Sequence, residues 1–492
     1  MKAILPHRFI RYAQHFSVES IFIQVSKISM DVFKTEIDSL GCFACYKNYT
    51  VTVNGHRIND SVLVVQTWLI DLLYNVVNIR FSGNKNITKD ETLYLIHLHN
   101  DYQNTCNSSR VNSKNVFYNV YGFFGEQKRF EEFDFVNEYS REEYILEKIS
   151  KRNHPKNNSN IDFYKEFLEN TGFSPKLFSS ILLLIYGYFT NEYPIINIET
   201  LKCDFKNPNL NKDNVLSVIN RYSCSIDEIK NAKLKRQFLY IKPFVRIGSY
   251  YVCSNSCLAI SLFTNSNYWI MRNKYLNSAT NKQKFLNAFG IYFEIYVEEV
   301  LSNCLSEKQF YNIPEGNSKR ADWHLNIGEY NFIIEQKSSL SILGIKQTEP
   351  DIEKMKEYIV STWGEAFEQL CTTEQELSIN ESIKVILLYE DYFMSESLEL
   401  LFELRPDLKE KYDNRYWLVT IKELEMLLYT YKTNPDIFFE IIKAKDEAEK
   451  MNSRDGRTIT KFLRQYKITK NMYLEQFGIT NEFDELKNLI AN

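Results

Sequence analysis

The chain has 492 residues, of which 44% are hydrophobic and 25% are charged, and its formal net charge is −4. This composition is typical of a folded globular protein with two or three domains. No stretch is apolar over the roughly 20 residues that a membrane helix needs, so no membrane partner is expected. The small net charge neither indicates nor excludes nucleic acid, because the distribution of charge decides that question.

The N-terminal residues MKAILPHRFIRYAQHF lack the apolar run and the small-residue cleavage site of a signal peptide. The chain has nine cysteines, an odd number, and they are scattered along its length. Such a pattern favours reduced thiols over a disulfide framework. The sequence therefore predicts a cytoplasmic protein.

Residues 1–275 are predicted to form a mainly α-helical domain. Val51–Val53 is expected to pair across the Asn54-Gly55 turn, which is a strong hairpin signal. The apolar segment 60–78 is expected to be a helix with an acidic N-cap. Capping boxes predict the starts of further helices at three positions: Thr88, Ser140 and Ser225.

From Phe238 to Cys253 the pattern becomes that of a small β-hairpin turning at Gly248-Ser249. The window 201–250 holds ten Lys and Arg against four Asp and Glu. A basic window is usually a solvated face, but it can also contact phosphates or a protein partner. The candidate nucleic-acid contacts are Lys233, Lys235 and Arg236.

The segment 316–339, with the sequence GNSKRADWHLNIGEYNFIIEQKSS, predicts two strands joined by a turn at Gly328. Asp322 begins the first strand, and Glu335 and Lys337 lie on the second. Because side chains alternate along a strand, Glu335 and Lys337 share a face, and the hairpin brings Asp322 close to them. Carboxylates suit Mg²⁺ and a lysine can orient water. The alternative interpretation is an ion pair on an exposed strand.

Asp322 followed by Glu335-Gln336-Lys337 resembles the D-x(n)-E-x-K signature of the PD-(D/E)XK, or restriction-endonuclease-like, nuclease superfamily. Ala321 stands where the family often has proline. The predicted elements from Gln283 onward also match the αβββαβ core of that superfamily. We therefore expect an α/β fold, with the nuclease-like domain at 276–432 and a helical tail at 433–492.

The resemblance implies a set of site residues. Glu294 on the predicted helix 283–301 matches the family's helix glutamate, although helix geometry alone would not choose it over Glu299. Gln369 on the predicted helix 351–371 matches a polar residue that faces the site, with Glu365 one turn earlier as the alternative. The implied ligands of one or two Mg²⁺ ions, which Mn²⁺ would replace, are Glu294, Asp322, Glu335 and the backbone carbonyl of Gln336. Lys337 would position the attacking water.

The resemblance further implies a metal-dependent endonuclease, with DNA as the expected substrate. The large N-terminal domain suggests a regulated enzyme of restriction or antiphage defence, acting as a homo-oligomer or with a co-encoded defence protein; this step is analogy at the level of the fold. Two alternatives stay open. One is a catalytically silent nuclease-like fold that binds nucleic acid or supports assembly, and the other is an RNase.

Overall fold

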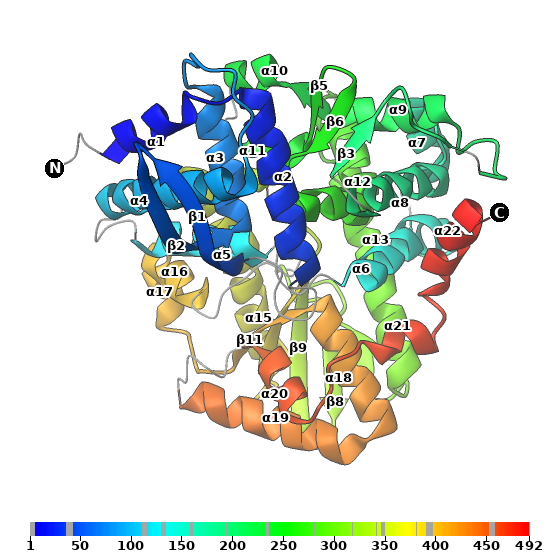
Figure 1. Ribbon diagram of the computed structural model, residues 1–492. Coiled ribbons are helices and arrows are strands. Elements are labelled where there is room, and N and C mark those ends of the chain that lie inside the picture. The colour runs from blue at the N-terminus through cyan, green and yellow to red at the C-terminus, as the bar shows by residue number, and fades with distance from the viewer. Residues whose placement is uncertain are drawn as a thin grey trace.

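The computed structural model describes residues 5–35, 43–110, 116–128, 134–157, 161–191, 194–203, 205–232, 236–278, 281–316, 318–340, 342–345, 350–379, 381–389, 397–451 and 458–491. Helices and three β-sheets occur in these ranges. The α/β class predicted from the sequence is confirmed. Figure 1 shows one sheet in the lower half of the molecule, with most of the N-terminal elements above it.

The lower sheet has five strands in the order β11-β10-β9-β8-β7. Its members are β7 (Phe310–Asn312), β8 (Trp323–Ile327), β9 (Tyr330–Lys337), β10 (Ile383–Leu388) and β11 (Tyr416–Thr420). Strands β9, β10 and β11 run parallel, whereas β8 is antiparallel to both β7 and β9. From α13 (Lys284–Cys304) onward, the elements follow the predicted order of helix, three strands, helix and strand as far as β10. Two helices that were not predicted, Ser397–Leu404 and Pro406–Lys409, then precede β11 and its following helix.

Helices cover both faces of this sheet. One face packs against α13, α18 (Ile421–Thr433) and α19 (Pro435–Lys450), and the other packs against α14 (Ile352–Tyr358), α15 (Glu365–Glu376) and α16 (Ser397–Leu404). Side chains of strand β9 alternate between the two faces. Phe332 and Ile334 belong to the apolar cluster that includes α13, α18 and α19, whereas Ile333 belongs to the cluster that includes α14, α15 and α16. The predicted helix 351–371 is observed, but it continues to Glu376 and contains the π-helical turn Ile359–Gly364.

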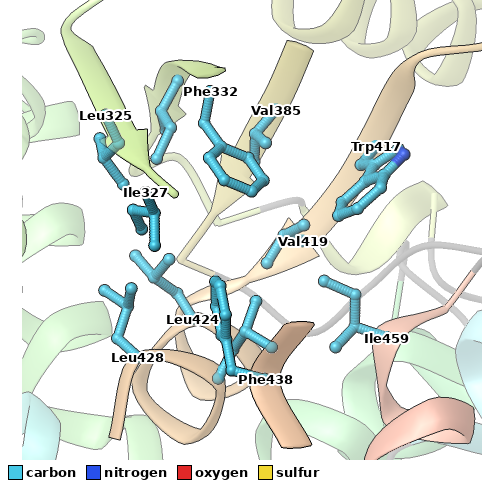
Figure 2. Close-up of a pocket in the computed structure, with 12 residues that line it drawn as sticks. Leu325, Ile327, Phe332, Val385, Trp417, Val419, Leu424, Leu428, Phe438 and Ile459 are labelled. Carbon is cyan, nitrogen blue, oxygen red and sulfur yellow. The ribbon is translucent and has the colours of Figure 1, made fainter. Parts of the chain in front are cut away.

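An apolar pocket lies between this sheet and the helices α18 and α19 (Figure 2). Its lining includes Leu325, Phe332 and Trp417 from the strands and Leu428 and Phe438 from the helices. None of the described residues that line it has an ionisable side chain. The pocket is therefore part of the hydrophobic core and offers no group for catalysis.

The N-terminal half is built around a second group of elements. A long hairpin, β1 (Phe43–Val53) and β2 (His56–Val65), packs with helices around its own apolar cluster. Those helices include α1 (Leu5–Ala13), α2 (Val18–Thr35), α3 (Gln66–Val77) and α4 (Lys89–Arg110). A four-stranded sheet follows in the order β3-β6-β5-β4, formed by Ile195–Asn197, Tyr250–Cys253, Phe244–Ile247 and Ser223–Ser225.

Three local predictions in this half are wrong. Residues 60–65 form the end of β2, where Val62 and Val64 are buried on one face, so the helix expected at 60–78 begins only at Gln66. Residues 238–241 belong to the helix α11 (Arg236–Ile241), so the predicted hairpin is confirmed only as β5 and β6. Ser140 lies inside α6 (Phe135–Glu143), whose N-cap is Asp134. The capping boxes at Thr88 and Ser225 are confirmed.

A buried ion pair joins sequence regions that are far apart. Arg141 on α6 donates to both carboxylate oxygens of Glu425 on α18, at 2.7 Å each. Tyr296 of α13 and Asn471 of the C-terminal segment donate to the same carboxylate. One continuous apolar cluster likewise contains residues from Tyr139 to Leu486. Buried contacts thus join residues on both sides of the predicted domain boundaries at 276 and 433. Those boundaries stay a prediction.

Replacing Arg141 with alanine should strongly destabilise the fold. The substitution leaves the fully buried Glu425 carboxylate without its cation, a loss of about 3–5 kcal/mol for a broken buried pair. Urea unfolding followed by tryptophan fluorescence measures the change in midpoint. The control is Lys354→Ala, which breaks an exposed pair with Asp351 and should change stability by less than about 1 kcal/mol. Equal effects of the two variants would contradict a structural role for the Arg141–Glu425 pair.

Candidate functional site

The register of the β8–β9 hairpin places the first two candidate residues together. Trp323 pairs with Ile334, and Ile327 pairs with Tyr330 across a two-residue turn. Gly328 takes the first position of that turn with a φ of 63°, a conformation that side chains disfavour and that a type II′ turn requires. Asp322, one residue before Trp323, therefore lies opposite Glu335. The backbone N–H of Gln336 donates to Asp322 Oδ2 at 2.8 Å.

Asp322 and Glu335 form a buried carboxylate pair. Glu335 is only 3% exposed, and its Oε2 accepts no hydrogen bond from any described donor. Burial, and then the neighbouring charge of Asp322, raises the pKa of Glu335 to about 8. Burial, and then the charge of Glu294, raises the pKa of Asp322 to about 6, against the lowering effect of the Gln336 N–H. Two like charges this close resist joint ionisation, so the pair holds a proton near neutral pH.

Lys337 lies on the same face as Glu335, as the strand alternation predicted. Its Nζ donates to Glu335 Oε1 at 2.7 Å and to Gln369 Oε1 at 3.1 Å. Gln369 in turn donates from Nε2 to the carbonyl of Arg320 at 3.2 Å. The structure thus brings Gln369 into contact with Lys337, while its role stays a prediction. The alternative on the same helix, Glu365, has an exposed side chain whose ion-pair partner is Lys319.

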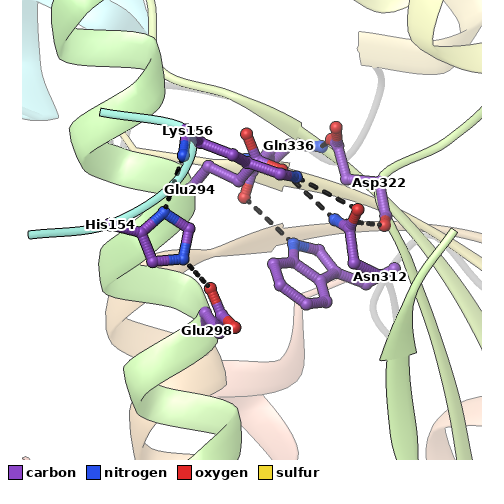
Figure 3. A network of polar contacts seen from close by, with 8 residues as sticks. His154, Lys156, Glu294, Glu298, Asn312, Asp322 and Gln336 are labelled. Atoms are coloured by element: carbon purple, nitrogen blue, oxygen red, sulfur yellow. Dashed lines mark hydrogen bonds and ion pairs between the residues drawn. The ribbon is translucent and has the colours of Figure 1, made fainter. Parts of the chain in front are cut away.

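Glu294 of α13 contacts Asn312, which also contacts the backbone of Asp322 (Figure 3). Glu294 Oε1 accepts from the ammonium of Lys156 and, at 3.2 Å, from Nδ2 of Asn312. The same Nδ2 donates to the backbone carbonyl of Asp322 at 3.1 Å, so Asn312 links Glu294 to the strand that begins after Asp322. Glu299 instead binds Tyr144 and Arg152. The structure thus brings Glu294, and not Glu299, to the candidate site.

The contacts of Lys156 and Asn312 were missed by sequence reasoning. Lys156 lies in the polar stretch NHPKNNSN, which resembles an ordinary linker, and Asn312 ends the short strand β7. Neither position has a motif that would mark it. The Gln336 side chain points away from Glu335, and its Oε1 accepts from the Trp323 indole at 3.4 Å.

The predicted nucleic-acid contacts are not described at the level of side chains. Lys233 and Lys235 lie outside the described residues, and Arg236 is the first residue of α11. Their role stays a prediction from the local excess of basic residues. In the strands β5 and β6 that follow, Phe244 and Tyr251 belong to the continuous cluster from Tyr139 to Leu486, whereas Val245 belongs to the cluster around the β1–β2 hairpin.

The donor set fits a hard cation such as Mg²⁺, because it consists of carboxylate oxygens, one of which is buried and without a donor. Asp322 and Glu335 would supply the first two ligands. In the described part of the chain, no three His, Cys, Asp or Glu side chains are gathered as a ready metal site. The Glu294 carboxylate is bound to Lys156 and Asn312, so it would have to turn to become the third ligand.

The chain matches no model of a known protein family, and no curated protein matches it either. Across the described ranges, no helix combines the length and apolar character needed to cross a bilayer.

The raised pKa of Glu335 predicts a pH-dependent stability of the metal-free protein. The folded state holds its proton up to pH about 8, whereas an unfolded glutamate releases it near 4.5. The resulting stabilisation is complete below pH 4.5 or so and is lost as the pH rises to about 8. Glu335→Gln should lack this loss. The free energy of unfolding of the variant, relative to that of the wild type, should therefore rise with pH by up to about 1.4 kcal/mol per pH unit.

Denaturant unfolding in chelator, at several values between about pH 5 and pH 8, measures this difference. Glu353→Gln removes a largely exposed carboxylate and provides the matched control. Parallel stability curves for the wild type and Glu335→Gln would contradict the assignment of a shared buried proton.

Proposed function

We propose that the protein is a Mg²⁺-dependent nuclease that hydrolyses phosphodiester bonds, with DNA as the expected substrate. The observation that supports this most strongly is the buried Asp322–Glu335 pair, in which Glu335 Oε2 lacks a donor among the described residues and Glu335 Oε1 accepts from the Lys337 ammonium. Buried carboxylates that repel each other are unfavourable in a purely structural role, and they become favourable when a cation lies between them. The resemblance to the PD-(D/E)XK signature and the order of strands and helices point the same way.

Each residue of the proposed site has a distinct task. Asp322, Glu335 and, after it turns, Glu294 would hold Mg²⁺, with the backbone carbonyl of Gln336 as a further ligand. The bound ion would neutralise charge on the phosphate and help generate hydroxide. Lys337 would position the attacking water through its donors, and Gln369 would hold the Lys337 ammonium in place. A regulated role in restriction or antiphage defence is part of the same proposal.

The proposal predicts metal-dependent cleavage that depends on Asp322. Purified protein should cleave DNA with Mg²⁺ or Mn²⁺ and not with chelator. Asp322→Asn should abolish cleavage, because it replaces a charged ligand while keeping an oxygen that can accept from Gln336. The measurement is a parallel digest of DNA and RNA by both proteins. Cleavage of RNA alone would favour the RNase alternative, and metal-independent binding without cleavage would favour the silent module.

Substitution of Lys337 should affect cleavage without affecting metal binding, unlike substitution of a metal ligand. Lys337→Met removes a donor that is no ligand for Mg²⁺, so single-turnover cleavage should fall by roughly 10²–10⁴-fold while Mn²⁺ binding persists. Glu335→Gln should lose both. Calorimetry with Mn²⁺ beside single-turnover kinetics measures the two effects, and Lys354→Met, which changes a largely exposed lysine, is the control. Wild-type rates in Lys337→Met would make Lys337 an ordinary strand residue.

A further inference from the structure

A tight turn in the N-terminal half of the chain places Lys156 beside the proposed metal site. The backbone N–H of Asn157 donates to the carbonyl of His154 at 2.9 Å, which closes a turn over Pro155 and Lys156. Proline is favoured at the second position of such turns because its φ is already set. Lys156 therefore projects from a defined turn.

The turn is held along α13 by an ion pair and by a histidine–carboxylate contact. Arg152 binds Glu299 Oε2 at 2.7 Å, and His154 Nε2 lies 3.1 Å from Glu298 Oε2. The backbone N–H of Lys156 donates to Nδ1 of the same histidine at 3.2 Å, so a neutral ring would carry its proton on Nε2, facing Glu298. Glu294 lies one helical turn before Glu298 (Figure 3). The segment thus meets one side of α13 at Glu294, Glu298 and Glu299.

The ammonium of Lys156 lies among the groups of the proposed site. It donates to Glu294 Oε1 and, at 3.0 Å, to Asn312 Oδ1, and it lies 5.9 Å from the centre of the Trp323 ring. Asn312 also donates to Glu294 Oε1 at 3.2 Å and to the carbonyl of Asp322 at 3.1 Å. A cation therefore already binds the carboxylate that would serve as the third metal ligand.

We propose that Lys156 is a built-in competitor of the metal ion: its ammonium holds Glu294 away from Asp322 and Glu335 and must leave before a divalent ion binds all three. This inference rests on the proposed function, since it concerns the same carboxylates. It adds a regulatory contact between the N-terminal half and the site, and it makes Lys156 a positioning residue.

The physical basis is competition between like charges for one carboxylate. Glu294 is 17% exposed at its side chain, so its charge is only partly screened, whereas the Lys156 side chain is 40% exposed and has solvent into which it can swing. Mg²⁺ demands near-octahedral oxygen ligands, and an ammonium bound to one of them repels the ion. Removing the ammonium should therefore strengthen metal binding. A lysine that contacts substrate phosphate would behave differently, because its removal would weaken nucleic-acid binding and leave metal affinity unchanged.

The test is Mn²⁺ calorimetry on the full-length wild type, Lys156→Met and Lys151→Met. Methionine keeps the length of the lysine side chain without its charge. Lys151 lies in the same segment and contacts Tyr164, so Lys151→Met removes an equal charge that does not touch the site. We expect Lys156→Met to bind Mn²⁺ on the order of tenfold more tightly than the wild type, the effect of one nearby charge. Lys151→Met should bind like the wild type.

Binding of a DNA duplex in chelator is measured beside it. Unchanged DNA affinity together with tighter Mn²⁺ binding in Lys156→Met supports the inference. Equal Mn²⁺ affinity in Lys156→Met and the wild type overturns it but leaves the proposed function intact, and weaker DNA binding would then assign Lys156 to a phosphate. If neither the wild type nor Lys156→Met binds Mn²⁺, the metal centre itself is overturned and the inference with it.

Discussion

The pairing of Trp323 with Ile334 is the constraint on which the candidate site depends. A shift of one residue would move Glu335 and Lys337 to the opposite face of the sheet and separate them from Gln369. The short turn at Gly328 resists such a shift. Phe439 of α19 also packs against this turn so closely that a Cβ at Gly328 would lie 2.8 Å from its ring. The C-terminal segment thus helps to hold the hairpin that forms the site.

Each carboxylate of the site has a donor that compensates part of its charge. Glu335 has Lys337, Glu294 has Lys156, and Asp322 has the Gln336 N–H. The raised pKa values of Asp322 and Glu335 show that this compensation is incomplete, because burial and mutual repulsion still disfavour the charged forms. A divalent ion would supply the missing positive charge at the pair. The same ion would replace the positive charge that Lys156 supplies to Glu294. Metal binding at the pair would therefore affect the contact between Glu294 and the 152–157 segment.

The rest of the chain is attached to this centre through polar contacts that are buried. Glu425 alone receives hydrogen bonds from Arg141, Tyr296 and Asn471, which belong to three distant parts of the sequence. Such a carboxylate is stable only when all its partners are present. Helix α13 therefore has two roles: Tyr296 anchors it to this network, and Glu294, half a turn away, faces the candidate site.

The sequence by itself determined the α/β class, the β8–β9 hairpin and the common face of Glu335 and Lys337, because turn chemistry and the alternation of a strand are local properties. The contact of Gln369 with Lys337 was expected only from the resemblance to a family. It misassigned residues 60–65, where the apolar run pairs with β1 and its tertiary contacts override helical propensity. Helix geometry left Glu294 and Glu299 open, and only the resemblance favoured Glu294. The tertiary structure joins Glu294 to Asn312 and Lys156 and joins Glu299 to Tyr144 and Arg152. Those contacts join residues more than a hundred positions apart or from unrelated elements, and no local pattern encodes which charged side chain will find which partner across the core.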